Sequence, residues 1–173
     1  HIVQQLLTMS RLVPEAANLH EETEVNLVKL TREILAMIAP AALEKQIELE
    51  FESDKNIPPI IGDPTSLGIL IRNLVDNAIR YSYEKSRVLV RLQQQDQEIV
   101  LEVADNGPGI PPEFQARVFE RFFRVLGNKS PGSGLGLAIV QQICELHGGR
   151  VSLSCPTEGT GLVVRVFLPL NKI

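Results

Sequence analysis

Tryptophan is absent from the sequence, and aromatic side chains as a group are scarce, with six phenylalanines and two tyrosines among 173 residues. A surface that stacks nucleic-acid bases is therefore not expected, because such surfaces depend on exposed aromatic rings. The 17 basic residues are scattered along the chain, are outnumbered by 21 acidic ones, and leave a net charge of -4. Since nucleic-acid-binding domains usually carry a basic excess, we expect no nucleic-acid partner.

Cysteine is also rare, and long apolar runs are missing. Cys144 and Cys155 have neither the spacing of metal ligands nor that of a disulfide framework, so we expect two reduced thiols in a cytosolic protein. No stretch approaches the roughly 18 consecutive apolar residues of a membrane span. A signal peptide is not visible, and the chain starts without methionine, which indicates a fragment whose parent would meet a membrane only through other parts.

The sequence does contain both helix and strand patterns, and its length of 173 residues suits one domain. Apolar residues recur with helical spacing in 1–13, in most of 25–39, in 64–81 and before Gly148, and they alternate in 46–52, 87–95, 98–105, 150–155 and 161–170. The strands come as hairpins instead of regular strand-helix-strand units. The fold class predicted is therefore α+β, a two-layer α/β sandwich with a mostly antiparallel mixed sheet and helices on one face.

The helix that follows Asp63 carries polar side chains beside its apolar stripe. Asp63 is a good N-cap, and the proline after it suits the first helical position. At about 100° per residue, Asn73, Asn77 and Arg80 share one stripe, with Tyr81 at its edge. Such residues can simply mark the boundary between core and solvent. Asparagine amides also offer neutral oxygens that suit a hard cation such as Mg²⁺.

The segment VADNGPGI breaks the strand pattern directly after Asp105. A tight turn explains this run of glycine and proline without any chemistry. Alternatively, a carboxylate fixed at a strand end could accept a hydrogen bond from an exocyclic amine such as that of adenine. Gly107 and Gly109 would then let the ligand approach the main chain.

Three glycines, Gly132, Gly134 and Gly136, alternate immediately before the next helix. They could form a hinge without a ligand, or they could present free N–H groups to phosphate at a helix N-terminus. The motif is not a Walker A loop, because no Gly-Lys-Ser/Thr follows, and its place in the chain argues against a dinucleotide fold.

The segment PPEFQARVFERFFRVLGNKS precedes these glycines and interleaves phenylalanine with arginine. One interpretation is a short amphipathic helix that packs its aromatic rings into the core. The other is a mobile lid, at about residues 111–133, whose Arg or Lys reaches phosphate.

Taken in order, the motifs NLVDNAIRY, DNGPGI, FERFFR, GSGLGLAIV and GTG resemble those of the ATP-binding catalytic domain of bacterial sensor histidine kinases. That family belongs to the superfamily shared with gyrase, Hsp90 and MutL. The resemblance runs from about residue 25 to the end, and Gram-negative sensor kinases of the quorum-sensing type look like near relatives. It implies a Bergerat-type ATP-binding fold that uses ATP and Mg²⁺.

The resemblance also implies a role for each matching residue. Asn73 and Asn77 would bind Mg²⁺, with Asn77 as the main ligand, while Arg80 would meet phosphate and Tyr81 would pack near the nucleoside. Asp105 would hydrogen-bond the adenine amino group. The other matching positions would surround the nucleotide: Gly107, Gly109, Ile110 and Thr160 beside the base; Phe119, Arg121, Phe122, Phe123, Arg124 and Lys129 in the lid; and Gly132, Ser133, Gly134, Leu135, Gly136 and Leu137 against the phosphates. Which lid Arg or Lys meets the γ-phosphate stays open.

The residue at position 73 bears on the type of reaction. In the ATPase branch of the superfamily, a glutamate at this position activates water as a general base. Asn73 cannot take a proton, so the resemblance implies a site that positions the γ-phosphate of ATP for another nucleophile and hydrolyses ATP poorly. In the family, that nucleophile is a histidine on a separate pair of dimerisation helices.

None of the three histidines fits the family's His-Glu-x-x-x-Pro arrangement for a phosphoacceptor. His1 lies at the start of the chain, His20 in a polar segment, and His147 at a helix end where contact with the helix dipole is expected. The helix pattern of residues 1–14 resembles the tail of the family's second dimerisation helix, which normally follows the acceptor helix. The resemblance therefore implies a linker at 15–24 and a catalytic domain at 25–173, in a fragment without the acceptor histidine.

The partners expected are the chain's own dimerisation and phosphoacceptor domain and a response regulator, within a homodimeric parent. The location expected is the cytoplasmic side of a bacterial inner-membrane sensor. Two alternatives remain open: a gyrase-like, nucleotide-gated ATPase module, which strong ATP hydrolysis would favour, and a degenerate scaffold, which failure to bind ATP would favour.

Overall fold

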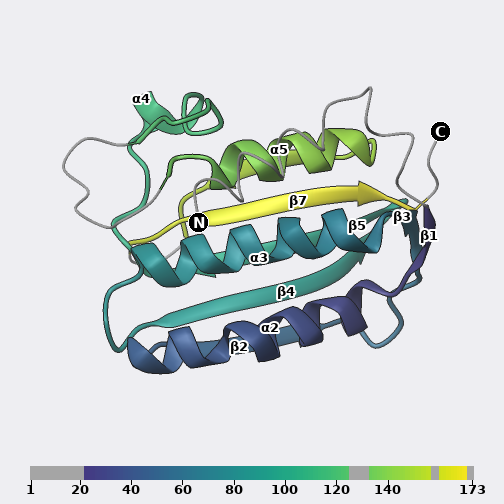
Figure 1. The fold of residues 1–173 in the computed structure, drawn as a ribbon, viewed down its shortest axis with the longest axis horizontal. Helices are drawn as coiled ribbons and strands as arrows, with labels where there is room; N and C mark the ends of the chain where they lie inside the picture. The colour runs from purple at the N-terminus through teal and green to yellow at the C-terminus, as the bar shows by residue number, and fades with distance from the viewer. Residues whose placement is uncertain (1–21, 125–132, 157–159, 171–173) are drawn as a thin grey trace.

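A five-stranded sheet runs through the structure, a computed structural model that describes residues 22–124, 133–156 and 160–170 (Figure 1). The sheet is mixed but mostly antiparallel, since only the pairing of β2 with β4 is parallel. In spatial order the strands are β2 (Glu48–Ser53), β4 (Arg87–Gln95), β5 (Glu98–Asp105), β7 (Val163–Pro169) and β6 (Arg150–Ser154). The expected hairpins β4–β5 and β6–β7 are confirmed.

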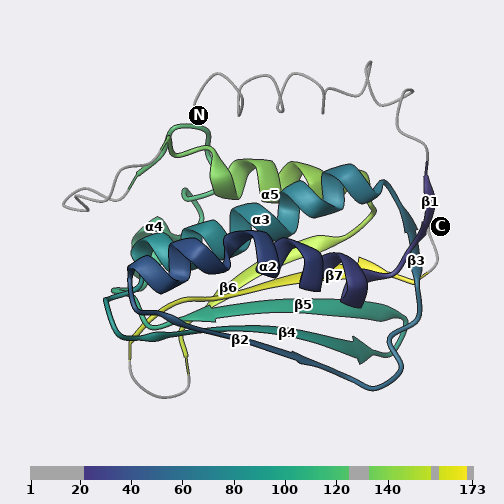
Figure 2. The same cartoon turned by 60° about the horizontal axis from the view of Figure 1, so that its bottom comes forward.

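The long helices of the described residues all lie on one face of this sheet, and none of them lies on the other (Figure 2). They are α2 (Leu27–Glu44), α3 (Pro64–Tyr81) and α5 (Gly136–Leu146). At one end lies the short helix α4 (Pro112–Gln115), and at the other β1 (Thr23–Val25) pairs antiparallel with β3 (Ile60–Gly62) (Figure 1). The predicted two-layer α+β sandwich is confirmed. None of the described helices is long and apolar enough to cross a membrane.

The start of α3 follows directly from the sequence. Asp63 caps the helix, because its carboxylate oxygens accept hydrogen bonds from the N–H groups of Thr65 (3.2 Å) and Ser66 (2.9 Å). Proline occupies the first helical position, where no intrahelical N–H is needed. The apolar stripe of the helix is buried against its neighbours at Leu67, Leu70, Ile71, Leu74 and Ala78. The polar residues of α3 lie beside this buried stripe.

Two boundaries near the N-terminus differ from those expected. Helix α2 continues through Pro40 to Glu44, although proline cannot donate a hydrogen bond to the preceding turn. Packing holds this last turn, because Ala42 is buried and its carbonyl accepts the N–H of Ile47 (2.8 Å). Strand β1 begins at Thr23, inside the segment interpreted as a linker. Its partner β3 is too short to produce a detectable alternation in the sequence.

Several predictions concern residues outside the described ranges. They concern the helix at 1–13, most of the linker at 15–24, and the residues His1, His20, Lys129 and Gly132.

The centre of the core lies on β5. Ile99, Leu101 and Val103 are almost fully buried on the face that the helices cover, as the alternation predicts. On β7, Val164 and Val166 are buried beside them. Apolar burial of this kind contributes about 25 cal/mol per Å². The two central strands therefore form a firm base for the residues at their ends.

The uncovered face of the sheet is charged. Arg91 pairs with Glu52 (2.8 Å) and with Glu102 (3.2 Å), and Glu102 also pairs with Arg165 (2.6 Å). This row of ion pairs crosses four strands and covers the apolar atoms beneath it.

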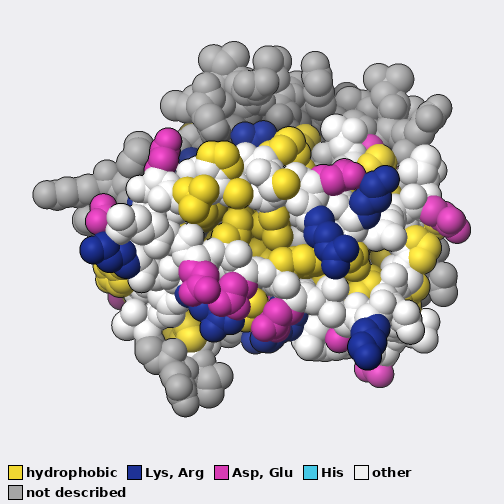
Figure 3. All heavy atoms as spheres, turned by 90° about the horizontal axis from the view of Figure 1, so that it is seen from below, with side chains coloured by type: hydrophobic (Ala, Val, Ile, Leu, Met, Phe, Trp, Pro, Cys, Tyr) yellow, Lys and Arg dark blue, Asp and Glu magenta, His cyan; other side chains and the backbone are white. Residues whose placement is uncertain are grey.

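The side of the molecule formed by α2 and β2 has a mixed surface. Exposed hydrophobic side chains on it are bordered by acidic and basic ones (Figure 3). The alternating glutamates of β2 also protect an edge strand from pairing with another chain.

His147 and the two cysteines lie outside the cavity described below, and His147 has a role in the fold. The Nδ1 atom of His147 lies 2.8 Å from the carbonyl of Ile143, and its Nε2 accepts the N–H of Asp63 (3.2 Å). The expected contact with the C-terminal end of α5 is therefore present. Both cysteines are free, and burial raises the pKa of the Cys144 thiol to about 12, which keeps it protonated; Cys155 is exposed.

Candidate functional site

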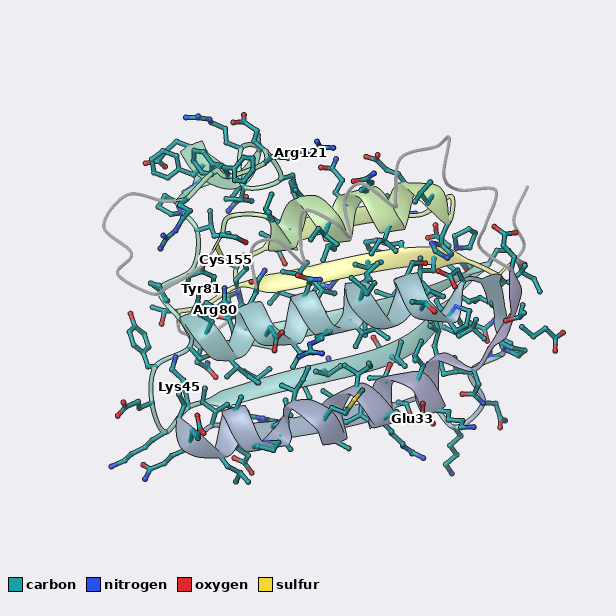
Figure 4. All side chains as sticks on the ribbon, viewed as in Figure 1. Glu33, Lys45, Arg80, Tyr81, Arg121 and Cys155 are labelled. Carbon is teal, nitrogen blue, oxygen red and sulfur yellow. The ribbon has the colours of Figure 1, made fainter. Side chains whose placement is uncertain are left out.

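A cavity of about 430 Å³ opens between the second half of α3, the end of β5 and the segment that leads into α5. Small-molecule sites typically have volumes of about 300 to 1,000 Å³. Arg80 and Tyr81 lie at the end of α3 that borders this cavity (Figure 4). The cavity brings together thirteen of the residues expected in a nucleotide site: Asn73, Asn77, Arg80, Tyr81, Asp105, Gly109, Ile110, Phe123, Arg124, Ser133, Gly134, Gly136 and Leu137.

The last residue of β5, Asp105, forms one wall of this cavity. Its Oδ1 accepts hydrogen bonds from the backbone N–H groups of Gly107 (2.8 Å) and Leu162 (3.2 Å). The described residues offer no hydrogen-bond donor to the other oxygen, Oδ2. One oxygen therefore fixes the carboxylate, and the other is left to accept a hydrogen bond from a ligand.

Burial affects the ionisation of this carboxylate. Removal from water raises the pKa of Asp105 above its ordinary value of 3.8, and the hydrogen bonds from Gly107 and Leu162 offset part of that rise. Groups whose pKa is shifted by burial are common at functional sites. The Asp105 carboxylate is thus held in place through Oδ1, while Oδ2 has no hydrogen-bond donor among the described residues.

Gly161 makes this arrangement possible. A Cβ atom at this position would lie 1.9 Å from the backbone oxygen of Asp105, and φ is +136°, so only glycine fits. The close approach lets the chain enter β7 directly beside the end of β5. It also places the N–H of Leu162 within reach of the carboxylate.

Two asparagine side chains face the cavity from α3. The Nδ2 of Asn73 donates to the carbonyl of Ile69 (2.8 Å), which fixes the amide and leaves its oxygen without a donor among the described residues. The Asn77 amide makes no hydrogen bond within the described part of the chain. It lies against Gly136 at the start of α5, where a Cβ atom would be 2.9 Å from its nitrogen and 3.1 Å from its oxygen.

We therefore expect Gly136→Ala to weaken nucleotide binding by about tenfold, because the new methyl group would displace the Asn77 amide. Calorimetry with ATP and Mg²⁺ measures this effect. Gly68→Ala is the matched control, since the same methyl group within α3 meets Ile34 at an ordinary 3.6 Å. That control should bind nucleotide normally and gain about 0.5–1 kcal/mol in the free energy of unfolding. Normal binding by Gly136→Ala would contradict the role given to Asn77.

The described part of the lid segment is held by aromatic contacts. Phe123 lines the cavity, its ring lies 5.9 Å from that of Phe114, and the guanidinium of Arg117 lies 4.4 Å from its centroid. Phe122 has a positive φ of 64° and donates its N–H to the carbonyl of Gly134 (3.0 Å). This hydrogen bond joins the described part of the lid segment to the stretch that leads into α5.

Some expected residues do not line the cavity. Gly107 contributes through its N–H bond to Asp105 and Leu135 is part of the core, whereas Arg121 and Phe122 are exposed on the lid segment. Arg121 lies apart from Arg80 and Tyr81 (Figure 4). Phe119 and Thr160 are also absent from the cavity wall, and Lys129 and Gly132 lie outside the described residues.

Sequence reasoning assigned no site role to several residues of the cavity wall. Most of the apolar ones lie in or next to α3, β5 and β7, where their pattern in the sequence indicates core packing only, and Val118 lies in the turn after α4: Leu74, Ala78, Val103, Val118, Leu162 and Val164. Asp76 and Tyr83 also line the cavity. Asp76 is a helix neighbour of the two asparagines, but its pairing with Arg72 at 3.5 Å resembles an ordinary surface ion pair.

The donor atoms of this site suit Mg²⁺ better than a softer metal. Within residues 22–124, 133–156 and 160–170, no group of three or more His, Cys, Asp or Glu side chains could hold a metal ion. The amide oxygens of Asn73 and Asn77 are hard, neutral ligands, and Mg²⁺ usually takes few protein ligands together with water and substrate phosphates. The residues present therefore fit a magnesium ion that arrives with a phosphate ligand.

Comparison with known proteins shows which family this chain matches. Residues 62–172 match the family described as histidine kinase-, DNA gyrase B-, and HSP90-like ATPase. The sensor protein kinase PmrB of Pseudomonas aeruginosa is 40% identical over 172 residues, which are 99% of this chain and 35% of that protein. The chain spans about a third of the length of the curated relatives it matches.

Solved structures give the same result. Full-length ShkA in complex with AMPPNP has a TM-score of 0.84 and 30% identity, over 99% of this chain and 35% of that one. Histidine kinase ThkA in complex with the response regulator protein TrrA has a TM-score of 0.75 and 26% identity, over 98% of this chain and 49% of that one.

Proposed function

This chain belongs to the family of histidine kinase-, DNA gyrase B- and HSP90-like ATPases, and we propose that it is the catalytic domain of a sensor histidine kinase. It binds ATP with Mg²⁺ and presents the γ-phosphate to a histidine of a dimerisation domain. The phosphoryl group then passes to a response regulator. The relatives that support this proposal are sensor kinases that match nearly the whole chain.

The observation that carries the proposal is the state of Asp105. One carboxylate oxygen is bonded twice to the backbone, and the other has no donor among the described residues. The exocyclic amine of adenine is a donor that matches this free acceptor. The apolar walls formed by Val103, Leu162 and Val164 would enclose the flat base.

The opposite part of the cavity suits phosphates. Arg80 brings a positive charge, Gly134 and Gly136 bring backbone N–H groups near the start of α5, and Asn77 brings a ligand for Mg²⁺. The bound ion would neutralise phosphate charge and polarise the phosphoryl oxygens. Asn73 cannot serve as a general base, and its amide is engaged with the carbonyl of Ile69. The site therefore positions a phosphoryl group for an external nucleophile.

The partners proposed are a dimerisation domain that carries the acceptor histidine and a response regulator. ThkA, a structural neighbour, is seen with the response regulator protein TrrA. We propose a homodimeric parent whose catalytic part lies in the cytoplasm of a bacterium, below a sensor in the inner membrane.

The test is a phosphotransfer assay with this chain, ATP labelled at the γ-phosphate, Mg²⁺ and a dimerisation fragment of the parent. We expect acid-labile, base-stable phosphate on the fragment, and none when its histidine is replaced by glutamine or when EDTA is added. Rapid release of inorganic phosphate without phosphohistidine would identify a gyrase-like ATPase instead. Failure of the chain to bind ATP would identify a non-catalytic scaffold.

A further inference from the structure

We propose that Lys45 is a positioning residue for the nucleotide site, an inference that rests on the proposed function. Its side chain does not line the cavity; it extends from the end of α2 to the end of α3 that carries Arg80 and Tyr81 (Figure 4). The ammonium group donates to the carbonyls of Ile79 (3.0 Å), Arg80 (2.7 Å) and Ser82 (3.2 Å). One side chain from another helix thus binds the backbone on which two site residues stand.

These carbonyls are groups that a helix end leaves without intrahelical partners. The last turn of α3 also carries the negative end of the helix dipole, which favours a cation. An ammonium group has three N–H donors, so Lys45 can satisfy three carbonyls at once. Hydrogen bonds to a charged group are about twice as strong as neutral ones. The side chain therefore restrains the last turn firmly.

The opposite side of this turn rests on the loop that follows β5. A Cβ atom on Gly107 would lie 2.6 Å from the carbonyl oxygen of Tyr81, so the two backbones are in close contact. The same Gly107 donates its N–H to Asp105 Oδ1 (2.8 Å). The end of α3 is thus held between Lys45 and the Asp105–Gly107 turn. A shift of this helix end would move Tyr81 and the Asp105 carboxylate relative to each other.

Lys45 is itself well fixed for this role. It is the C-cap of α2, and its carbonyl accepts the N–H of Lys85 (3.3 Å) in the turn that follows α3. A second backbone bond joins the same two turns, from the N–H of Glu48 to the carbonyl of Ser86 (2.9 Å). The backbone of Lys45 is therefore fixed next to the edge strand β2. Because its side chain does not line the cavity, Lys45 can influence the cavity only through its bonds to the end of α3.

We expect Lys45→Met to raise the Kd of the 173-residue chain for ATP with Mg²⁺ by about tenfold, measured by calorimetry well below the Tm. The Kd for ADP should rise by the same factor, because the nucleoside beside Tyr81 is common to ATP and ADP. A residue that touched the γ-phosphate would change ATP binding alone. The amide of Ser82, which donates to the carbonyl of Ala78 (3.0 Å), should exchange faster with solvent.

Lys29→Met is the matched control, since that side chain is 76% exposed on α2 and should leave both Kd values unchanged. Lys45→Arg should restore most of the affinity, because it keeps a cationic donor at the helix end. If Lys45→Met does not fold, Lys45→Gln carries the same test with a smaller expected increase. Wild-type binding by Lys45→Met, or by Lys45→Gln where Lys45→Met does not fold, would overturn the inference whether or not the Tm is lower. A wild-type chain that does not bind ATP would overturn the proposed function instead.

Discussion

Asp105→Asn should weaken ATP binding by roughly 10- to 100-fold, which corresponds to the loss of one hydrogen bond to a charged acceptor. The amide keeps an oxygen for the N–H groups of Gly107 and Leu162, so its NH₂ group replaces the free Oδ2 in the cavity. That group would then face the adenine amine, donor against donor. Calorimetry with ATP and Mg²⁺ measures the change, and Asp96→Asn, an exposed turn position, is the control.

The same substitution should have an opposite effect on the protein without ligand. Because burial raises the pKa of Asp105, the stability contributed by this group is fully present below its ordinary value of 3.8 and is lost as the pH rises through the raised value. At neutral pH, Asp105→Asn removes a buried charge and should raise the Tm. This gain in Tm should shrink as the pH falls toward 3.8.

For the binding experiment, an Asp105→Asn variant that binds ATP like the wild type would disprove the assignment of Asp105 to adenine.

Asn77→Ala should abolish the enhancement of nucleotide binding by Mg²⁺ and lower phosphoryl transfer to the dimerisation fragment by about 100-fold or more. Alanine is the best helix former, so the substitution leaves α3 intact. Titrations with ATP in the presence of Mg²⁺ and of EDTA separate the two contributions. Wild-type and variant proteins should bind ATP equally in EDTA, because the Asp105 side of the site is unchanged.

Two further alanine variants make the Asn77 experiment specific. Asn73→Ala should retain part of the Mg²⁺ effect, since the resemblance makes Asn77 the main ligand and the Asn73 amide already donates to the carbonyl of Ile69. Asn56→Ala removes an exposed amide outside the cavity and should behave like the wild type. If the Mg²⁺ dependence of Asn77→Ala equals that of the wild type, Asn77 is not the ligand.

Much of the fold follows from local patterns. The Asp63 cap with its proline, the buried stripe of α3 and the alternation of β5 each depend on a few consecutive residues, and each is confirmed. The parallel pairing of β2 with β4 does not follow, because nothing local specifies which strand becomes a neighbour. The continuation of helix α2 beyond Pro40 does not follow either, because proline favours the end of a helix and only packing with the rest of the fold stabilises the last turn.

The candidate site shows the same division. Asp105, Asn73 and Asn77 stand in recognisable motifs, and the structure brings them to one cavity. The contact of Lys45 with the end of α3 connects two turns that are distant in the sequence, so no motif contains it. The positive φ of Phe122 is likewise set by its tertiary bond to Gly134 and not by its own preference.

The attachment of Asp105 has a consequence for the timing of the reaction cycle. Its carboxylate is bonded to backbone at the ends of two central strands, which are among the last parts of a protein to open, whereas the phosphate side of the cavity depends on connecting segments. We expect a nucleotide held by its base to stay bound while its phosphates change partners. Loading and transfer are then separate events, and a loaded domain waits for its acceptor.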